Sequence, residues 1–137
     1  MRILVNLNVL LDVLQSRRPY YADSARALSD AVRGRVAALI PGHSVTTLYY
    51  IIARQAGKSR ADEAVDWMLN RFGVAVCNKD VLLRARALAL ADYEDAVVAA
   101  MAERELCDAI LTRNVADFSG SPIPAITPAE FVKRNRR

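Results

Sequence analysis

Short runs of apolar residues separated by longer, helix-like segments are the feature that most restricts the fold of this chain. Five such runs are too short for helices and are bounded by Pro, Gly or polar residues. They cover residues 3–5, 36–40, 74–77, 109–112 and 124–126. Runs that are apolar throughout, instead of at alternate positions, are typical of strands buried on both faces. The pattern predicts a central, mostly parallel sheet with helices on both sides, a three-layer α/β/α sandwich.

The segments between these runs have the composition and the end signals of helices. Helices are predicted over residues 9–15, 22–32, 44–55, 59–72, 81–90 and 93–104, and again from residue 128. Asn78, Asp92 and Thr127 stand where a side chain can cap the helix that follows. Ser59 with Asp62 resembles a capping box for the fourth helix. His43, between Gly42 and Ser44, is expected in a turn.

The length and the charge distribution predict one domain with a short basic tail. The 137 residues fit a single domain, which we place at residues 1–132. The net charge is +4, and the tail at residues 133–137 carries four cations, so the rest of the chain is neutral overall. Such a tail can contact phosphates, but a solvated helix end is the favoured interpretation. Without a signal peptide or an apolar stretch of membrane-spanning length, we expect a cytoplasmic protein and no membrane partner. Both cysteines, Cys77 and Cys107, are expected as free, buried thiols.

Polar side chains follow the first and the fourth predicted strands, at the point where each strand ends. Asn6 and Asn8 come after the first strand, and Asn114 and Asp117 follow the strand that ends at Thr112. Because functional groups collect beyond the carboxyl ends of parallel strands, these side chains could meet in one crevice. The chain has a single histidine, which makes a histidine general base a poor candidate. Cleavage of a phosphodiester would then need Mg²⁺ or Mn²⁺ held by converging oxygen ligands.

A second acidic group, Asp92, Glu94 and Asp95, begins the predicted sixth helix. Acids in the first turn of a helix also stabilise it through its dipole, so the group has a purely structural interpretation as well. Asp95 is the better metal candidate, because Asp92 can already cap the helix. Asp117 could be an ordinary loop acid and Asn114 a turn residue. The remaining candidate, Asp12, is expected on a solvated face of the first helix.

Taken together, these motifs resemble the PIN domain family over residues 1–131. The matching pieces are Asn-Leu-Asn-Val-Leu-Leu-Asp at 6–12, Asp92 to Ala96, Thr-Arg-Asn-x-x-Asp-Phe at 112–118 and Thr-Pro-Ala-Glu-Phe at 127–131. The resemblance implies a metal-dependent endoribonuclease, the toxin of a VapBC-type toxin–antitoxin pair, which uses Mg²⁺ or Mn²⁺. It also implies an RNA substrate, a protein antitoxin and a homodimer. By position, the catalytic and metal-binding residues are Asn6, Asp95 and Asp117. The supporting residues are Asn8, Asp92, Glu94, Thr112 and Asn114.

Two departures from the family pattern predict reduced activity. Asn6 offers a neutral oxygen where the family has the Asp of an Asp-Thr-Asn sequence, and residues 44–50 lack the Glu that many relatives carry on that helix. The alternative to an impaired ribonuclease is therefore an inactive PIN-fold module that binds RNA or a partner protein. A nucleotide-binding Rossmann-like domain fits the alternation of elements but lacks the glycine-rich phosphate motifs. A receiver domain would need an early acid pair where Asn6 and Asn8 stand.

Overall fold

A parallel sheet of five short strands forms the middle layer of the protein. The computed structural model describes residues 1–34 and 36–136. The strands are β1 (Arg2–Val5), β2 (Ala37–Pro41), β3 (Gly73–Ala75), β4 (Ala109–Leu111) and β5 (Ala125–Ile126). They are ordered β3-β2-β1-β4-β5, and every neighbouring pair is parallel. Because β1 is central, the chain that follows it lies at the middle of the carboxyl edge of the sheet.

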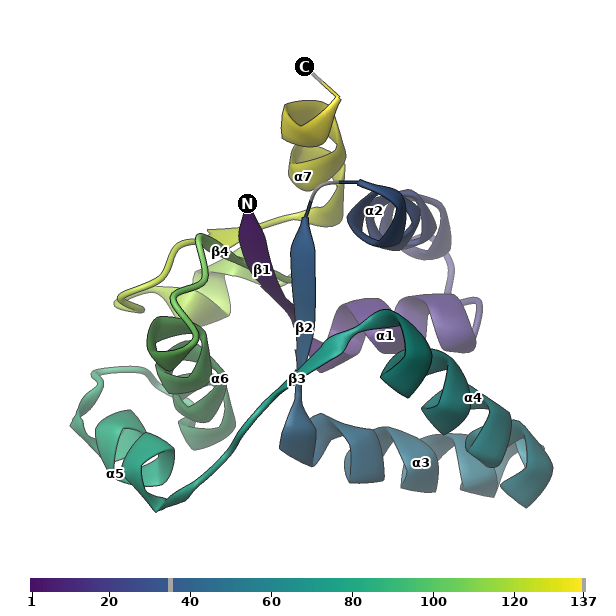
Figure 1. Cartoon of the computed structure of the whole chain (residues 1–137), viewed down its shortest axis with the longest axis horizontal. Coiled ribbons are helices and arrows are strands. Elements are labelled where there is room, and N and C mark those ends of the chain that lie inside the picture. Colours follow the sequence, from purple (N-terminus) through teal and green to yellow (C-terminus); the bar gives the residue numbers. More distant parts are fainter. Residues whose placement is uncertain (35, 137) are drawn as a thin grey trace.

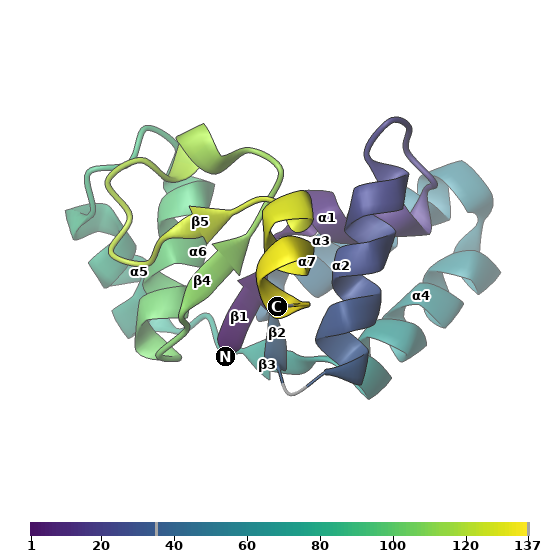
Figure 2. The same cartoon turned by 90° about the horizontal axis from the view of Figure 1, so that it is seen from above.

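Helices cover both faces of this sheet. They are α1 (Leu7–Leu14), α2 (Tyr21–Arg33), α3 (Gly42–Ala56), α4 (Lys58–Arg71), α5 (Lys79–Ala87), α6 (Tyr93–Arg104) and α7 (Pro128–Asn135), with a 3-10 turn η1 (Val115–Phe118). Figure 1 shows α5 and α6 on one side of the sheet and α1 to α4 on the other. Seen from above in Figure 2, α7 lies beside α2, with which it is in contact. The predicted three-layer α/β/α sandwich is confirmed.

The central strand divides the core into two clusters. Ile3 and Val5 of β1 are fully buried among residues of α1 to α4 and α7, whereas Leu4 between them is fully buried among residues of α5 and α6. The strand is therefore apolar at every position because both of its faces are covered. Residues 96–102 of α6 are all buried as well, which fixes this helix against the sheet and its first turn at the carboxyl edge.

Three of the predicted helix caps are present. The side chain of Asn78 accepts a hydrogen bond from the Val81 N–H group, and Asp92 accepts one from Asp95. At α7, Thr127 Oγ1 accepts from the Glu130 N–H group at 3.1 Å. Each cap satisfies a backbone donor that the helix leaves without a partner. In α6 the cap also fixes the backbone that carries Asp95.

Several boundaries differ from those predicted. The capping box at Ser59 is wrong: α4 begins at Lys58, and its N-cap is Gly57, which also ends α3. Gly57 has a φ of 94°, so the two helices join through one residue in a conformation that favours glycine. The turn expected at His43 is also wrong, since α3 begins at Gly42. In addition, β3 ends at Ala75 and α5 at Ala87, earlier than predicted.

The C-terminal residues and the cysteines complete the description. Residues 133–135 continue α7, and Arg136 forms an ion pair with Asp30 at 3.0 Å. Arg137, the last residue of the predicted tail, lies outside the described residues. Cys107 is buried, Cys77 is half-buried, and both thiols are free. Across residues 1–34 and 36–136, no helix has the length and apolar character that crossing a membrane requires.

Candidate metal centre

Asn6 stands where β1 ends and α1 begins. It is buried, and its side-chain Oδ1 accepts a hydrogen bond from the Leu7 N–H group at 2.9 Å, which starts the helix two residues before the predicted Val9. Its amide nitrogen Nδ2 donates to Thr112 Oγ1 at 3.3 Å. The side chain is therefore held by one backbone donor and one hydroxyl, at the carboxyl edge of the central strand.

Thr112 connects three of the predicted site residues. Its hydroxyl oxygen accepts from Asn6 Nδ2, from Asn8 Nδ2 at 3.1 Å and from the Asn114 N–H group at 3.1 Å. A hydroxyl oxygen can accept two hydrogen bonds, so these three N–H donors compete for two acceptor positions. The hydroxyl hydrogen of Thr112 has no acceptor among the three groups. A carboxylate at position 6 would accept that hydrogen. The hydrogen bonding around position 6 thus suits Asp better than Asn.

Asp95 lies in the first turn of α6 beside other acids. It is half-buried, whereas Asp92 and Glu94 are exposed. Burial, and after it repulsion from Asp92, Asp117 and Glu94 in that order, together raise the pKa of Asp95 to about 6. A raised pKa with close carboxylates is characteristic of functional sites. The buried side of α6 holds this carboxyl in place although its ionised form is disfavoured.

Asp117 reaches the same region from the turn that follows β4. It lies on η1, which packs against α6, and its N–H group donates to the Asn114 carbonyl at 3.1 Å. Its side chain is exposed but close enough to affect the ionisation of Asp95. Asn6, Asn8 and Asn114 therefore gather around Thr112, while the acids gather around Asp95.

The donor set can be compared with the needs of a divalent cation. Within the described residues, no three or more His, Cys, Asp and Glu side chains form a group that could hold a metal ion by themselves. Mg²⁺, however, commonly keeps several waters and uses one or two carboxylates, which Asp95 and Asp117 can supply. Asn8 Oδ1 is buried and, in the part of the chain that is described, has no hydrogen-bond partner. Two carboxylates and neutral amide oxygens fit a water-rich Mg²⁺ or Mn²⁺ site.

His43 and Ser44 supply polar groups, but no carboxylate, at the start of α3. Both ring nitrogens of His43 and the hydroxyl of Ser44 are buried without a hydrogen-bond partner among residues 1–34 and 36–136. Because β1 and β2 are parallel neighbours, α3 starts beside α1 at the carboxyl edge, and these two helices are in contact. A buried polar group without a hydrogen-bond partner is costly in free energy.

Sequence reasoning missed one charged residue near the site. Asp12 was expected on a solvated helical face, and this expectation is wrong, because its side chain is completely buried. Arg113 Nε donates to Asp12 Oδ2 at 3.0 Å, and Ser24 Oγ donates to the same atom at 3.1 Å. The signal was present in the sequence: Asp12 has apolar residues on both sides, from Val9 to Leu14. A charge within such a stretch is buried only with a partner.

Comparisons with known proteins identify the family of this chain. A family model described as PIN domain matches residues 2–116. A ribonuclease VapC1 from Aquifex aeolicus is 26% identical over 138 residues, covering 97% of this chain and 94% of that protein.

Solved structures give the same fold. VapBC2 from Rickettsia felis, bound to a promoter DNA fragment, has a TM-score of 0.72 at 15% identity and covers 93% of this chain and 98% of that one. A toxin–antitoxin complex from Klebsiella pneumoniae has a TM-score of 0.69 at 22% identity, with 92% and 97% covered. The Sarcin–Ricin loop cleaving toxin VapC20 from Mycobacterium tuberculosis has a TM-score of 0.70 at 14% identity, with 88% and 95% covered. With a family model matching most of its length and the same fold in these structures, the chain belongs to the PIN domain family.

Proposed function

We propose that this chain is a PIN-type endoribonuclease, the toxin of a toxin–antitoxin pair, that uses Mg²⁺ or Mn²⁺ and is weakened by Asn6. The observation that carries the proposal is the raised pKa of Asp95 beside Asp117, at the edge where Asn6 also lies. The ribonuclease and toxin names of the relatives support the same assignment. The metal ligands are Asn6, Asp95 and Asp117.

The supporting residues act by position and charge. Thr112 fixes the amides of Asn6 and Asn8, and Asp92 holds the first turn of α6 through its cap. Glu94 and Asp92 add negative charge that attracts a cation to the edge of the sheet. A bound divalent cation would activate a water molecule and stabilise the departing oxygen of an RNA phosphodiester. Asn114 contributes through its N–H group, which sets the direction of the Thr112 hydroxyl.

The decisive experiment converts Asn6 to Asp. The new carboxylate accepts the free hydrogen of Thr112 and adds the missing negative charge beside Asp95. We expect Asn6→Asp to tighten Mn²⁺ binding and to raise cleavage of single-stranded RNA by at least ~10-fold, the lower end of the loss typical for one outer-shell group. Calorimetric titration with Mn²⁺ and a cleavage assay on a mixed RNA pool measure the two effects.

Two controls separate metal chemistry from a change in folding. EDTA abolishes the gain, and so does a second change in Asn6→Asp/Asp95→Ala. If Asn6→Asp alters neither metal binding nor cleavage, while the original chain binds RNA or a protein partner tightly, the ribonuclease assignment is wrong. The chain is then an inactive PIN-fold binding module.

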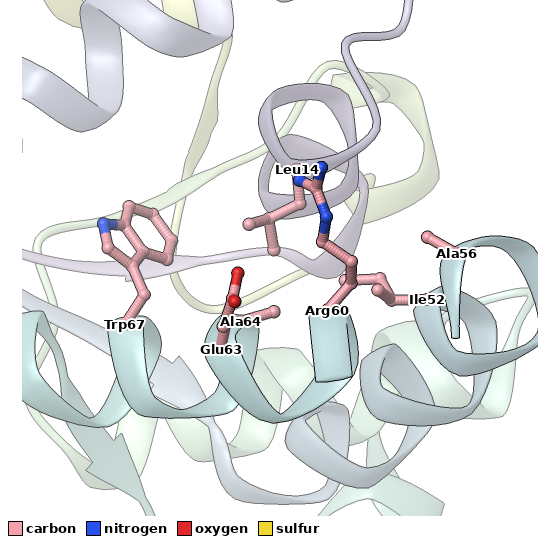
Figure 3. A pocket seen from close by; sticks show the side chains of 7 residues that line it. All are labelled: Leu14, Ile52, Ala56, Arg60, Glu63, Ala64 and Trp67. Carbon is pink, nitrogen blue, oxygen red and sulfur yellow. The ribbon is translucent and has the colours of Figure 1, made fainter. Parts of the chain in front are cut away.

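A cavity between α1, α3 and α4 is the binding site that we propose for the antitoxin. It has a volume of about 270 Å³, and Figure 3 shows the side chains that line it. Leu14, Ile52 and Trp67 supply apolar walls, and Arg60 and Glu63 project from α4 between Trp67 and Ile52. A groove that combines apolar walls with one cationic and one anionic side chain fits an amphipathic helix of a partner protein. The similar structure from Klebsiella pneumoniae is described as a toxin–antitoxin complex, which supports this occupant.

The test is co-expression with the product of the neighbouring reading frame. Ala56→Glu places a charge in the cavity, whereas Leu69→Glu places the same charge on an exposed position of α4 that does not line it. We expect co-purification to be lost with Ala56→Glu and retained with Leu69→Glu. Equal retention by both variants contradicts this docking site without affecting the proposed metal centre.

A further inference from the structure

Beside the candidate metal centre lies a second cavity, where the starts of α2 and α7 meet the end of β4. Its volume is about 320 Å³, within the range of small-ligand pockets. Tyr20, Pro128 and Ala129 supply apolar walls, and Arg113 supplies a guanidinium group. Arg113 directly follows Thr112, the residue that binds the side-chain amides of Asn6 and Asn8. The cavity is therefore next to the candidate metal centre along the chain.

Arg113 is held rigidly at this cavity. Its guanidinium carbon lies 4.2 Å from the centroid of the Tyr20 ring, and its Nε contacts both carboxylate oxygens of Asp12. In the described part of the chain, Nε is the only atom of this guanidinium that donates a hydrogen bond. The two terminal amino groups remain as a planar pair of donors, with 23% of the side chain exposed. Fixed donors lose little entropy when a ligand binds.

The charges around the cavity decide which ligand chemistry it suits. Arg113 is neutralised by the buried Asp12, and Asp23, which also lines the cavity, lies 3.9 Å from Arg26. The surroundings are therefore close to neutral, which gives little long-range attraction for a free anion. A planar, neutral group with two adjacent hydrogen-bond acceptors fits better. Single-stranded RNA presents such groups, because its unstacked bases bind between apolar side chains and donate or accept along their edges.

We propose that this cavity, formed by Tyr20, Arg113 and the start of α7, binds one nucleobase of the RNA strand next to the cleaved phosphate, with guanine preferred. The O6 and N7 atoms of guanine form the acceptor pair that an arginine fork recognises. Adenine presents an amino group at the matching position, which opposes the Arg113 donors. This inference rests on the proposed ribonuclease function and adds a base-recognition site to it.

The experiment measures RNA binding without cleavage. Labelled decamers of adenosine, each with one central guanosine, cytidine, uridine or adenosine, are titrated with the protein in EDTA and followed by fluorescence anisotropy. We expect the guanosine decamer to bind roughly 5- to 100-fold more tightly than the all-adenosine one, the discrimination of one bidentate contact. Equal binding of the four decamers overturns the proposal.

Two substitutions at one position identify the cavity. Ala129→Leu fills the cavity and leaves Asp12 and Arg113 themselves unchanged, and Ala129→Ser is the matched small control. The guanosine preference disappears in Ala129→Leu and remains in Ala129→Ser, with equal melting temperatures showing that both fold. Arg113→Lys keeps the charge next to Asp12 but loses the fork, so it also loses the preference. A preference that survives Ala129→Leu and Arg113→Lys contradicts the assignment.

The outcomes separate this proposal from the ribonuclease function. If Asn6→Asp cleaves RNA with Mn²⁺ but the four decamers bind equally, the base site is wrong and the function stands. If the guanosine preference depends on the cavity but Asn6→Asp does not cleave, the base site stands and the chain is an RNA-binding module.

Discussion

Asp95 carries an electrostatic cost that links stability, pH and metal binding. Its pKa is raised to about 6 in the folded protein, chiefly by burial and then by Asp92, Asp117 and Glu94. A carboxyl with a higher pKa in the folded state binds more protons there, so its contribution to stability is full below about pH 4. That contribution is lost as the pH rises through about 6. Metal binding needs the ionised form, so Mn²⁺ affinity rises over the same interval.

Asp95→Asn tests this account directly. At pH 7 without metal, the variant should be more stable by on the order of 1 kcal/mol, an amount reduced for solvent screening of a half-exposed site. Urea unfolding at pH 4 and pH 7 measures the difference, which should shrink at the lower pH. Equal stabilisation at both values would mean that charge at Asp95 is not the cause. The same variant should lose Mn²⁺ binding, because the amide of Asn lacks the negative charge of the proposed carboxylate ligand. A loss of function that accompanies a gain in stability is the trade-off expected at a functional site.

The buried Asp12–Arg113 ion pair makes a separate prediction about stability. Arg113→Met leaves a completely buried carboxylate without its cation and should cost about 3–5 kcal/mol in the free energy of unfolding. Adding Asp12→Asn removes the charge, so the double variant should recover part of that loss. Denaturant unfolding of the two single variants and the double variant gives the coupling between them. Additive losses would show that the pair is not the source of the cost.

At the scale of one element, the first turn of α6 combines a helix cap with a functional carboxyl. Asp92→Asn keeps a side-chain oxygen for the Asp95 N–H group but removes a charge that raises the pKa of Asp95. Asp92→Ala loses the cap as well and should cost ~1 kcal/mol of stability. Both variants should lower the pKa of Asp95, measured by NMR titration of its carboxyl. If only Asp92→Ala lowered that pKa, repulsion from Asp92 would be excluded as a cause.

Strands and helix starts could be predicted from the sequence wherever neighbouring residues alone determine them. Apolar runs gave all five strands, and Asn78, Asp92 and Thr127 cap their helices as expected. Gly57 ends α3 as its sequence position predicts, but the start of α4 was misplaced, because the same glycine is also the N-cap of α4 and the helix has already begun at Ser59.

The candidate site shows the same limit. The order of strands predicts that groups after β1 and β4 share an edge, but it does not reveal which side chains pair. Asp12 and Arg113 are 101 residues apart in the chain and meet only through tertiary packing. The competition of three donors for the Thr112 hydroxyl likewise depends on distances that no spacing in the sequence encodes. Metal binding by Asn6, Asp95 and Asp117 stays a prediction.

For the whole molecule, the exposed aromatic side chains of α3 bear on self-association. Helices α3 and α4 carry four bulky apolar side chains, Tyr49, Tyr50, Trp67 and Met68, any of which could contribute to an interface if it is exposed. Met68 is in fact fully buried, and Trp67 packs edge-on against Phe72. Tyr50, in contrast, is 69% exposed and meets Tyr49 edge-to-face, with ring centroids 6.3 Å apart.

We predict a homodimer in which Tyr50 is an interface anchor, because tyrosine combines a large apolar face with a polar end and is frequent at binding hot spots. Light scattering at high micromolar concentration should report twice the 15.1 kDa chain mass. Tyr50→Glu should shift the protein to monomer, since it places a charge where two copies would exclude water. Val76→Glu adds the same charge at another exposed apolar position, just beyond the end of β3, and should leave the dimer intact. A monomer at every concentration, or dissociation caused equally by both substitutions, would remove Tyr50 as the anchor of assembly.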